Sequence, residues 1–334
     1  MTRTRLVALA LVLVACGKKS GGGGGAAAPE LTGLAAVPAN AEDVIGVDVA
    51  KLLEAPLLER AIDQLFLRNA TLASEWQKIH DTCKLSLGKQ IKHVMLALGP
   101  HPGTAPGTGP TLLIATGQLV ESDLATCVRA MVGQGGGDLT AKTVENRTLY
   151  SVKDGAKSFF FGFGRPDTVV SGSQEAYVAL ALGSGKKAPD EPELVKWVAL
   201  ADQHQPIWWA GRVDERISGG LVKQSHGKLA HGPIGMAGTL DPTEGAKLDV
   251  KIVMGTADDA KQLESFAKDQ LAQLAMAAQL YKLGGVVNKV ELSVDGAIVR
   301  LRVALTLDDV NQVLSALDGG GGAAQDAPPS QGSN

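Results

Sequence analysis

Aromatic residues, long apolar runs and excess basic charge are all scarce in this chain. Phe, Trp and Tyr make up only 4% of the 334 residues, so aliphatic side chains and alanine must build most of the core. After residue 20 no stretch of 18 uncharged apolar residues occurs, which excludes a membrane-spanning helix there. The formal net charge of −3 gives no basic surface, so we expect no nucleic-acid partner.

Motifs for catalysis, metals and phosphates are also missing. The chain contains no Gly-x-Ser-x-Gly elbow and no metalloprotease or calcium-loop signature. The segment 183–187 lacks the first glycine of a Walker phosphate loop and has Lys187 where Ser or Thr belongs. His226 and His231 are five residues apart, which suits neither one helix face nor a zinc site. We therefore predict a protein that is not an enzyme and needs no metal or cofactor.

The N-terminus carries the clearest pattern that is present. Arg3 and Arg5 precede an apolar run of ten residues, 6–15, which is about 15 Å long as a helix and too short to cross a bilayer. A short cationic segment before such a run is typical of a signal peptide. We predict that residues 1–15 are a signal peptide, whose removal changes the formal charge from −3 to −5.

The run ends in Leu13-Val14-Ala15-Cys16, which resembles the lipobox of bacterial lipoproteins. The resemblance implies that Cys16 is acylated and that its acyl chains are the membrane attachment. Gly17, rather than Asp, follows the cysteine, and by the same resemblance the protein goes to the outer membrane, facing the periplasm. Residues 16–36 then form the lipidated cysteine and a flexible Gly- and Ala-rich tether.

The body of the chain contains many hairpins. Since hairpins outnumber strand–helix–strand crossovers, we predict an α+β fold with largely antiparallel sheets and helices packed on one face. The order strand, helix, hairpin, helix, hairpin occurs twice. This predicts two loosely repeated α+β halves, 37–203 and 204–318, followed by a disordered tail at 319–334.

Turn and cap residues position several of these elements. Pro56 suits the start of a helix that reaches Phe66, and Ser122 is expected to cap a helix over 122–131. Asp295-Gly296 is the strongest hairpin signal. The predicted strands are 44–49, 91–98, 111–117, 139–144, 148–152, 157–163, 168–171, 206–213, 234–240, 247–254, 289–294 and 298–305.

With Cys16 acylated, Cys83 and Cys127 remain as an even pair in an oxidising compartment. We predict that they form a disulfide, which encloses 45 residues and stabilises the fold by about 4 kcal/mol. The alternative is a catalytic cysteine, since His80 lies three residues before Cys83. No third group is evident that would orient this histidine.

Two aromatic clusters interrupt an otherwise aliphatic sequence. Phe159-Phe160-Phe161 with Phe163 is apolar on both faces and predicts a strand that is covered on each side. Trp208 and Trp209 are adjacent in a predicted strand, so their side chains point to opposite faces. One indole should enter the core while the other faces solvent, another domain or a ligand. Both are therefore candidate contacts for a ligand or partner.

Residues 37–52, after the tether, resemble a group of uncharacterised envelope lipoproteins of myxobacterial type. The similarity extends loosely over 37–318, includes the two body cysteines, which supports their pairing, and implies no known activity. Our first hypothesis is a non-enzymatic, lipid-anchored envelope protein that acts by contact with a partner protein or another copy of itself. The alternative is a carrier of a lipid or other apolar ligand, in a pocket between sheet and helices near Trp208 or Trp209. A sizeable apolar cavity would favour the carrier, and a filled core with an exposed apolar patch would favour the contact protein.

Overall fold

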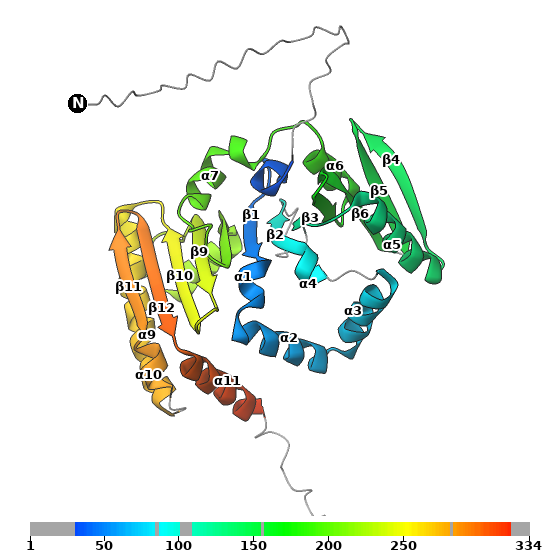
Figure 1. Ribbon diagram of the computed structural model, residues 1–334. Coiled ribbons are helices and arrows are strands. Elements are labelled where there is room, and N and C mark those ends of the chain that lie inside the picture. The colour runs from blue at the N-terminus through cyan, green and yellow to red at the C-terminus, as the bar shows by residue number, and fades with distance from the viewer. Residues whose placement is uncertain (1–30, 84–86, 101–108, 155–156, 281–282, 322–334) are drawn as a thin grey trace, which may run out of the picture.

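The computed structural model describes residues 31–83, 87–100, 109–154, 157–280 and 283–321 (Figure 1). These residues form an α+β fold built on one twelve-stranded antiparallel sheet, in agreement with the hairpin-rich sequence. Each of the described helices is too short or too polar to span a bilayer. The predicted signal peptide, Cys16 and the tether as far as residue 30 lie outside the described residues, as does the tail from residue 322.

The two predicted halves contribute to the same sheet. Its strands are β1 Asp43–Asp48, β2 Ile91–Leu98, β3 Thr111–Gly117, β4 Asp138–Val144, β5 Arg147–Asp154, β6 Lys157–Arg165, β7 Thr168–Gly172, β8 Ile207–Arg212, β9 Gly235–Asp241, β10 Ala246–Val253, β11 Val290–Asp295 and β12 Ile298–Leu305. Their order is β11-β12-β10-β9-β8-β1-β2-β3-β7-β6-β5-β4. The first strands of the halves, β1 and β8, thus pair with each other in the middle of the sheet.

The connections of the two halves follow one rule. Each half continues from its first strand into a pair of adjacent strands, β2–β3 or β9–β10. The last strand of each half then returns beside the second member of that pair, β7 beside β3 and β12 beside β10. The first half contains two more strands, β4 and β5. Whether the halves arose by duplication stays a prediction.

Helices and two short 3-10 turns flank the sheet. They are η1 Gly33–Ala36, α1 Val49–Leu53, α2 Pro56–Arg68, α3 Ala70–Cys83, α4 Leu87–Gln90, α5 Glu121–Gln134, α6 Glu175–Leu182, η2 Ala188–Asp190, α7 Pro192–Val198, α8 Glu215–Gln224, α9 Ala257–Leu280, α10 Gly284–Val287 and α11 Leu307–Gly321. Pro56 is the first residue of α2, as its missing N–H predicted.

The predicted cap at Ser122 is wrong, whereas the predicted hairpin at Asp295-Gly296 is confirmed, with its turn one residue later. Ser122 does not cap α5, because the helix already begins at Glu121 and the Ser122 hydroxyl donates to the Asp123 carboxylate. The β11–β12 hairpin turns at Gly296 and the residue after it, because Asp295 still pairs with Ile298. Gly296 has φ of 56°, a conformation that favours glycine.

Helices lie on both faces of the sheet, which corrects the prediction that they pack on one face. We call the face covered by α6 and α7 the front face, and the face covered by α5 and α9 the back face. On β6, Phe160 joins the front core, whereas Phe161 and Phe163 join the back core. A strand that is apolar on both sides needs cover on both sides, as the phenylalanine cluster predicted.

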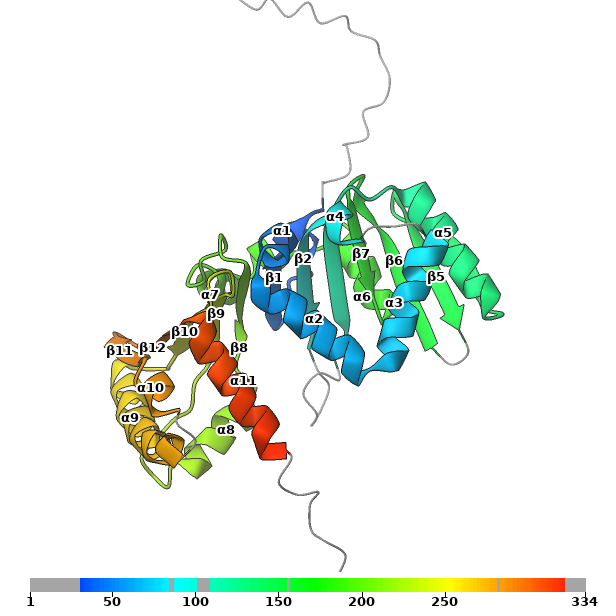
Figure 2. The same cartoon turned by 60° about the horizontal axis from the view of Figure 1, so that its bottom comes forward.

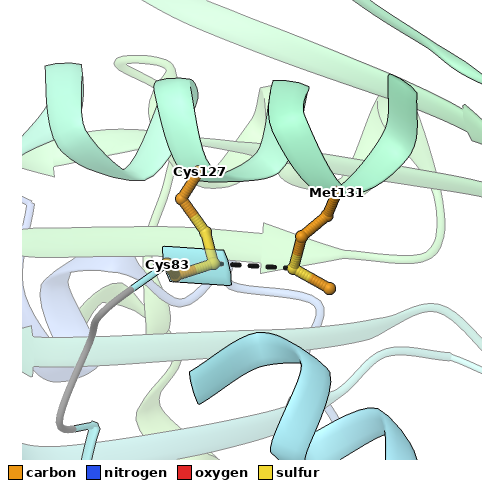
Figure 3. Close-up of a disulfide and its surroundings, with 3 residues drawn as sticks. All are labelled: Cys83, Cys127 and Met131. Atoms are coloured by element: carbon orange, nitrogen blue, oxygen red, sulfur yellow. Dashed lines mark hydrogen bonds between the residues drawn. A yellow bond between two sulfur atoms is a disulfide. The ribbon is translucent and has the colours of Figure 1, made fainter. Parts of the chain in front are cut away.

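Cys83 at the end of α3 and Cys127 in α5 form the predicted disulfide (Figure 3). Their Cα atoms are 4.9 Å apart, within the range that a disulfide requires. Met131 Sδ lies 3.5 Å from Cys83 Sγ. Because the oxidised sulfur has no hydrogen to donate, we interpret this as a packing contact. The disulfide therefore ties α3 to the helix layer of the back face.

The loop Gly183–Lys187 forms a helix cap and not a phosphate site. The Lys187 side chain is almost fully buried, and its Nζ donates to the carbonyl oxygens of Leu180 and Ala181 near the end of α6. Arg147 donates to the next carbonyl along the helix. These carbonyls have no partner within the helix, and the helix dipole also favours positive charge at this end.

The contribution of Lys187 to stability is expected to depend on pH. Burial, and then the neighbouring Arg147 guanidinium, lowers the pKa of Lys187 from 10.5 to about 8. Between about pH 8 and pH 10.5 the Lys187 amine is protonated in the unfolded chain and neutral in the folded protein. The free energy of unfolding therefore rises with pH in this range, by at most about 1.4 kcal/mol per pH unit. In urea denaturation the wild-type protein should gain stability over Lys187→Met from pH 8 upwards, with no relative change below pH 8. Parallel pH curves for the two proteins would contradict this prediction.

Candidate functional site

Trp208 and Trp209 lie next to each other on β8, on opposite faces of the sheet. Trp208 belongs to the front core, is only 6% exposed, and packs over Gly46 of β1. Trp209 is partly exposed on the back face and packs over Gly238 of β9. A Cβ atom on either glycine would lie 2.1 or 2.3 Å from the indole, so each ring depends on a glycine in the neighbouring strand. The prediction that one indole enters the core is confirmed.

An open pocket of about 600 Å³ lies beside Trp208, and we call it the front pocket. Four adjacent strands form its apolar floor, where Trp208, Met95 and Ile114 surround the backbone of Gly46. The rim is polar and includes Asp48, Lys51, His93, Thr116, Arg165 and His204. An apolar floor with a few polar groups around it is the usual form of a small-molecule site.

Lys51 and Asp48 hold one side of the rim in place. Lys51 Nζ lies 3.1 Å from Asp48 Oδ2 and donates to the carbonyl oxygen of His204 at 2.7 Å. Burial raises the pKa of Asp48, but hydrogen bonds from Lys51 outweigh burial and keep this pKa below its usual value. Asp48 is therefore a carboxylate at neutral pH, and its charge is already paired.

Thr32 and Thr116 also line the pocket, and their hydroxyls form a network with that of Thr168. The Oγ1 atoms of Thr32, Thr116 and Thr168 lie 3.3–3.4 Å from one another. Thr168 also donates to Asp167, which in turn accepts two hydrogen bonds from Arg165. The Arg165 hydrogen bonds are the main cause that lowers the pKa of Asp167. This network joins the segment before η1 to β3 and β7.

A second feature is a surface of exposed apolar side chains on the segment 49–83. We call this segment, α1–α3, the arch, because it leads from the end of β1 to the disulfide (Figures 1 and 2). The main neighbours of α2 are α1 and α3 and not a strand. The exposed large apolar residues of the arch are Leu53, Leu65, Leu67, Leu72 and Trp76.

A ring contact within the arch joins α2 to α3. The rings of Phe66 on α2 and Trp76 on α3 are 6.2 Å apart. Leu72 and Trp76 are one turn apart and therefore lie on the same side of α3. The extreme case is Leu67, which is 77% exposed.

The sequence reveals this surface only weakly. Helical spacing from Leu52 to Phe66 predicts the helices, but it is the same for a helix that packs on a sheet and for one that does not. One signal is present. Leu65, Phe66 and Leu67 are consecutive, and three consecutive residues of a helix cannot all face one core.

A second open pocket, of about 580 Å³, lies on the front side of β10, β12 and β11 and is lined mainly by charged residues. Arg300 forms a two-pronged ion pair with Asp249, which is the main cause that lowers the pKa of Asp249. Lys251 donates to the Leu200 carbonyl oxygen. These charges are satisfied by one another and by the backbone, so we interpret this pocket as a solvated polar face of the sheet.

His231 and Asp259 are the nearest approach to a catalytic pair. His231 Nδ1 lies 3.0 Å from Asp259 Oδ1, and Asp259 exchanges two hydrogen bonds with Thr256 at the start of α9. The Thr256 hydroxyl is thus engaged in a helix cap, the role that its spacing from Asp259 indicates. Among the described residues, no three His, Cys, Asp or Glu side chains are placed to hold a metal ion.

Neither protein-family models nor curated proteins match this chain. Among solved structures, crystal form I of the Treponema protein TP0453 is similar to it, with a TM-score of 0.43 and 12% sequence identity. The match covers 85% of this chain and 96% of TP0453. At this TM-score the similarity is too distant to indicate function, so the sites described above stand on their own geometry.

Proposed function

We propose that this protein is a lipid-anchored envelope protein that acts without catalysis, by binding a protein partner through the arch. The observation that carries the proposal is the number of large apolar side chains that α2 and α3 expose, because exposed apolar surface concentrated in one segment is a mark of protein contact sites. The anchor is supported by sequence alone. The lipobox-like residues that end at Cys16, followed by Gly17, favour the outer membrane, facing the periplasm.

A protein partner fits the arch better than a lipid surface does. Residues 56–83 contain four acidic and three basic residues. Helices that lie on anionic membranes are instead rich in Lys and Arg on their polar face. A partner that offers an apolar centre within a polar rim of mixed charge matches the composition of the arch.

The carrier hypothesis has less support. A carrier of lipid needs an enclosed apolar cavity, whereas the two front-face pockets, of about 600 and 580 Å³, are open and bordered by charged side chains. Well-packed apolar cores lie under the helices of both faces. Filled cores with exposed apolar side chains beside them are the combination expected of a protein that works by contact.

Replacing Leu65 and Leu67 together by Glu should remove partner binding and leave the fold intact, because both side chains are at least half exposed. The matched control is Leu274→Glu with Met276→Glu, two similarly exposed apolar residues on α9. Proteins crosslinked to the tagged full-length chain in intact cells are identified and quantified by mass spectrometry. One identified partner should fall by about tenfold or more in the arch variant and remain constant in the control.

Equal recovery of all proteins with both variants would contradict the proposal, as would an equal loss with both. If the only crosslinked protein is this same chain, the partner is a second copy of the protein and not a different one. A decrease confined to the arch variant supports the proposal only if that variant keeps the unfolding midpoint of the wild-type protein.

A further inference from the structure

We propose that the front pocket binds a small organic anion, with its apolar body on Trp208 and its carboxylate at the polar rim. This site is separate from the arch, and the inference does not rest on the proposed partner. The floor comes from β8, β1, β2 and β3, the middle of the sheet. Central strands hold the residues of a binding site in a more precise geometry than loops do. The pocket volume of about 600 Å³ suits a small organic molecule.

The Trp208 indole supplies a hydrogen-bond donor for which the described residues provide no acceptor. More than nine-tenths of Trp208 is buried, yet its Nε1–H makes no hydrogen bond with the residues that the structure describes. A buried tryptophan normally finds a partner for this N–H group. The nitrogen is not sealed in the core as the unpaired Tyr177 hydroxyl is, and the residue lines the front pocket. An acceptor atom of a ligand in the pocket would provide the hydrogen-bond partner of this N–H group.

The rim offers N–H donors and a single carboxylate. N–H groups come from His93, from His204 and from Lys51, which has a third N–H group besides the two that bind Asp48 and the His204 carbonyl oxygen. Arg165 already donates to Asp167, and Asp48 is the only carboxylate among the lining residues. Asp48 is already paired with Lys51. A ligand that brings its own carboxylate therefore meets complementary groups, and a cationic ligand does not.

The ligand needs an apolar body as well as a charge. The floor of the pocket presents only uncharged groups to a ligand. These are the side chains of Met95 and Ile114, the Trp208 ring and the backbone of Gly46, which has no side chain. An aromatic or branched aliphatic body removes this apolar surface from water, which an inorganic anion cannot do. The geometry thus favours a carboxylate with an aromatic or branched aliphatic body.

Fluorine NMR of the full-length protein labelled with 5-fluorotryptophan tests the site. The four tryptophans give four signals, assigned by single Trp→Phe variants. Phenylacetate is the probe, and phenylacetamide is the neutral control of the same shape. Phenylacetate should shift the Trp208 signal saturably and leave the Trp209 signal in place. Its affinity should exceed that of phenylacetamide by about tenfold, since hydrogen bonds to a charged group are the stronger ones.

Trp208→Phe keeps an aromatic ring but lacks the N–H group, and it should weaken phenylacetate binding by about tenfold. Trp209→Phe, on the opposite face, should leave the affinity unchanged. No saturable shift of Trp208 up to about 10 mM phenylacetate would overturn the proposal. Equal binding of phenylacetamide, or equal shifts of all four signals, would also overturn it. The shift of Trp208 in the unsubstituted protein locates binding even if a variant fails to fold.

Discussion

Reduction of the Cys83–Cys127 disulfide is expected to lower the free energy of unfolding by about 4 kcal/mol. The bond joins residues separated by 44 positions, and its reduction returns to the unfolded chain the freedom that the closed loop removes. In the folded protein the same bond holds α3 against α5. Equilibrium denaturation in guanidinium chloride, with and without dithiothreitol, measures the difference.

The matched control is the double variant Cys83→Ala with Cys127→Ala. It should have the stability of the reduced protein and should not respond to dithiothreitol. Limited proteolysis of the reduced protein should begin within the arch, because α2 has its main contacts with α1 and α3. Equal unfolding free energies for the oxidised and reduced wild-type protein would contradict this prediction.

Phe161→Ala is expected to destabilise the protein by about 3–5 kcal/mol, the usual result when a fully buried aromatic side chain is removed. Phe161 is 1% exposed, and its ring stacks on Tyr150 with the ring centres 4.7 Å apart. The substitution would leave a cavity beneath α5, in the core of the back face. Thermal or urea denaturation of the variant gives the loss directly.

Phe159→Ala provides the comparison within the same strand. Phe159 points to the same face as Phe161 but is 45% exposed, so we expect a loss of about 1 kcal/mol. A loss at Phe159 as large as at Phe161 would show that the back core extends further along β6 than described. Such a result would contradict the lower burial of the Phe159 side chain.

Much of the sheet is predictable because its strands are short apolar segments between strong turn signals. The predicted strands 91–98 and 111–117 coincide with β2 and β3. The face on which each helix packs is not predictable in this way, because it depends on contacts between distant segments. Both α5 and α6 follow strands of the first half, yet they cover opposite faces.

The candidate sites are predictable to different degrees. The cysteine pair follows from an even count after Cys16 is set aside. Strand alternation separates Trp208 from Trp209, but it does not say which indole enters the core. That outcome depends on α7, which packs against β8 on the front face. The sequence indicates a pocket near Trp208 or Trp209, but the polar rim of the front pocket is beyond prediction, since its residues come from segments far apart in the chain.

Site-specific photocrosslinking in living cells is the most direct test of the arch as a protein contact surface. A benzophenone amino acid is incorporated in place of Leu67, and in a second strain in place of Met276, which is 66% exposed on α9. The account predicts one discrete protein adduct with the Leu67 replacement and none with the Met276 replacement. An adduct with lipid at the Leu67 position, or the same adducts from both positions, would contradict it.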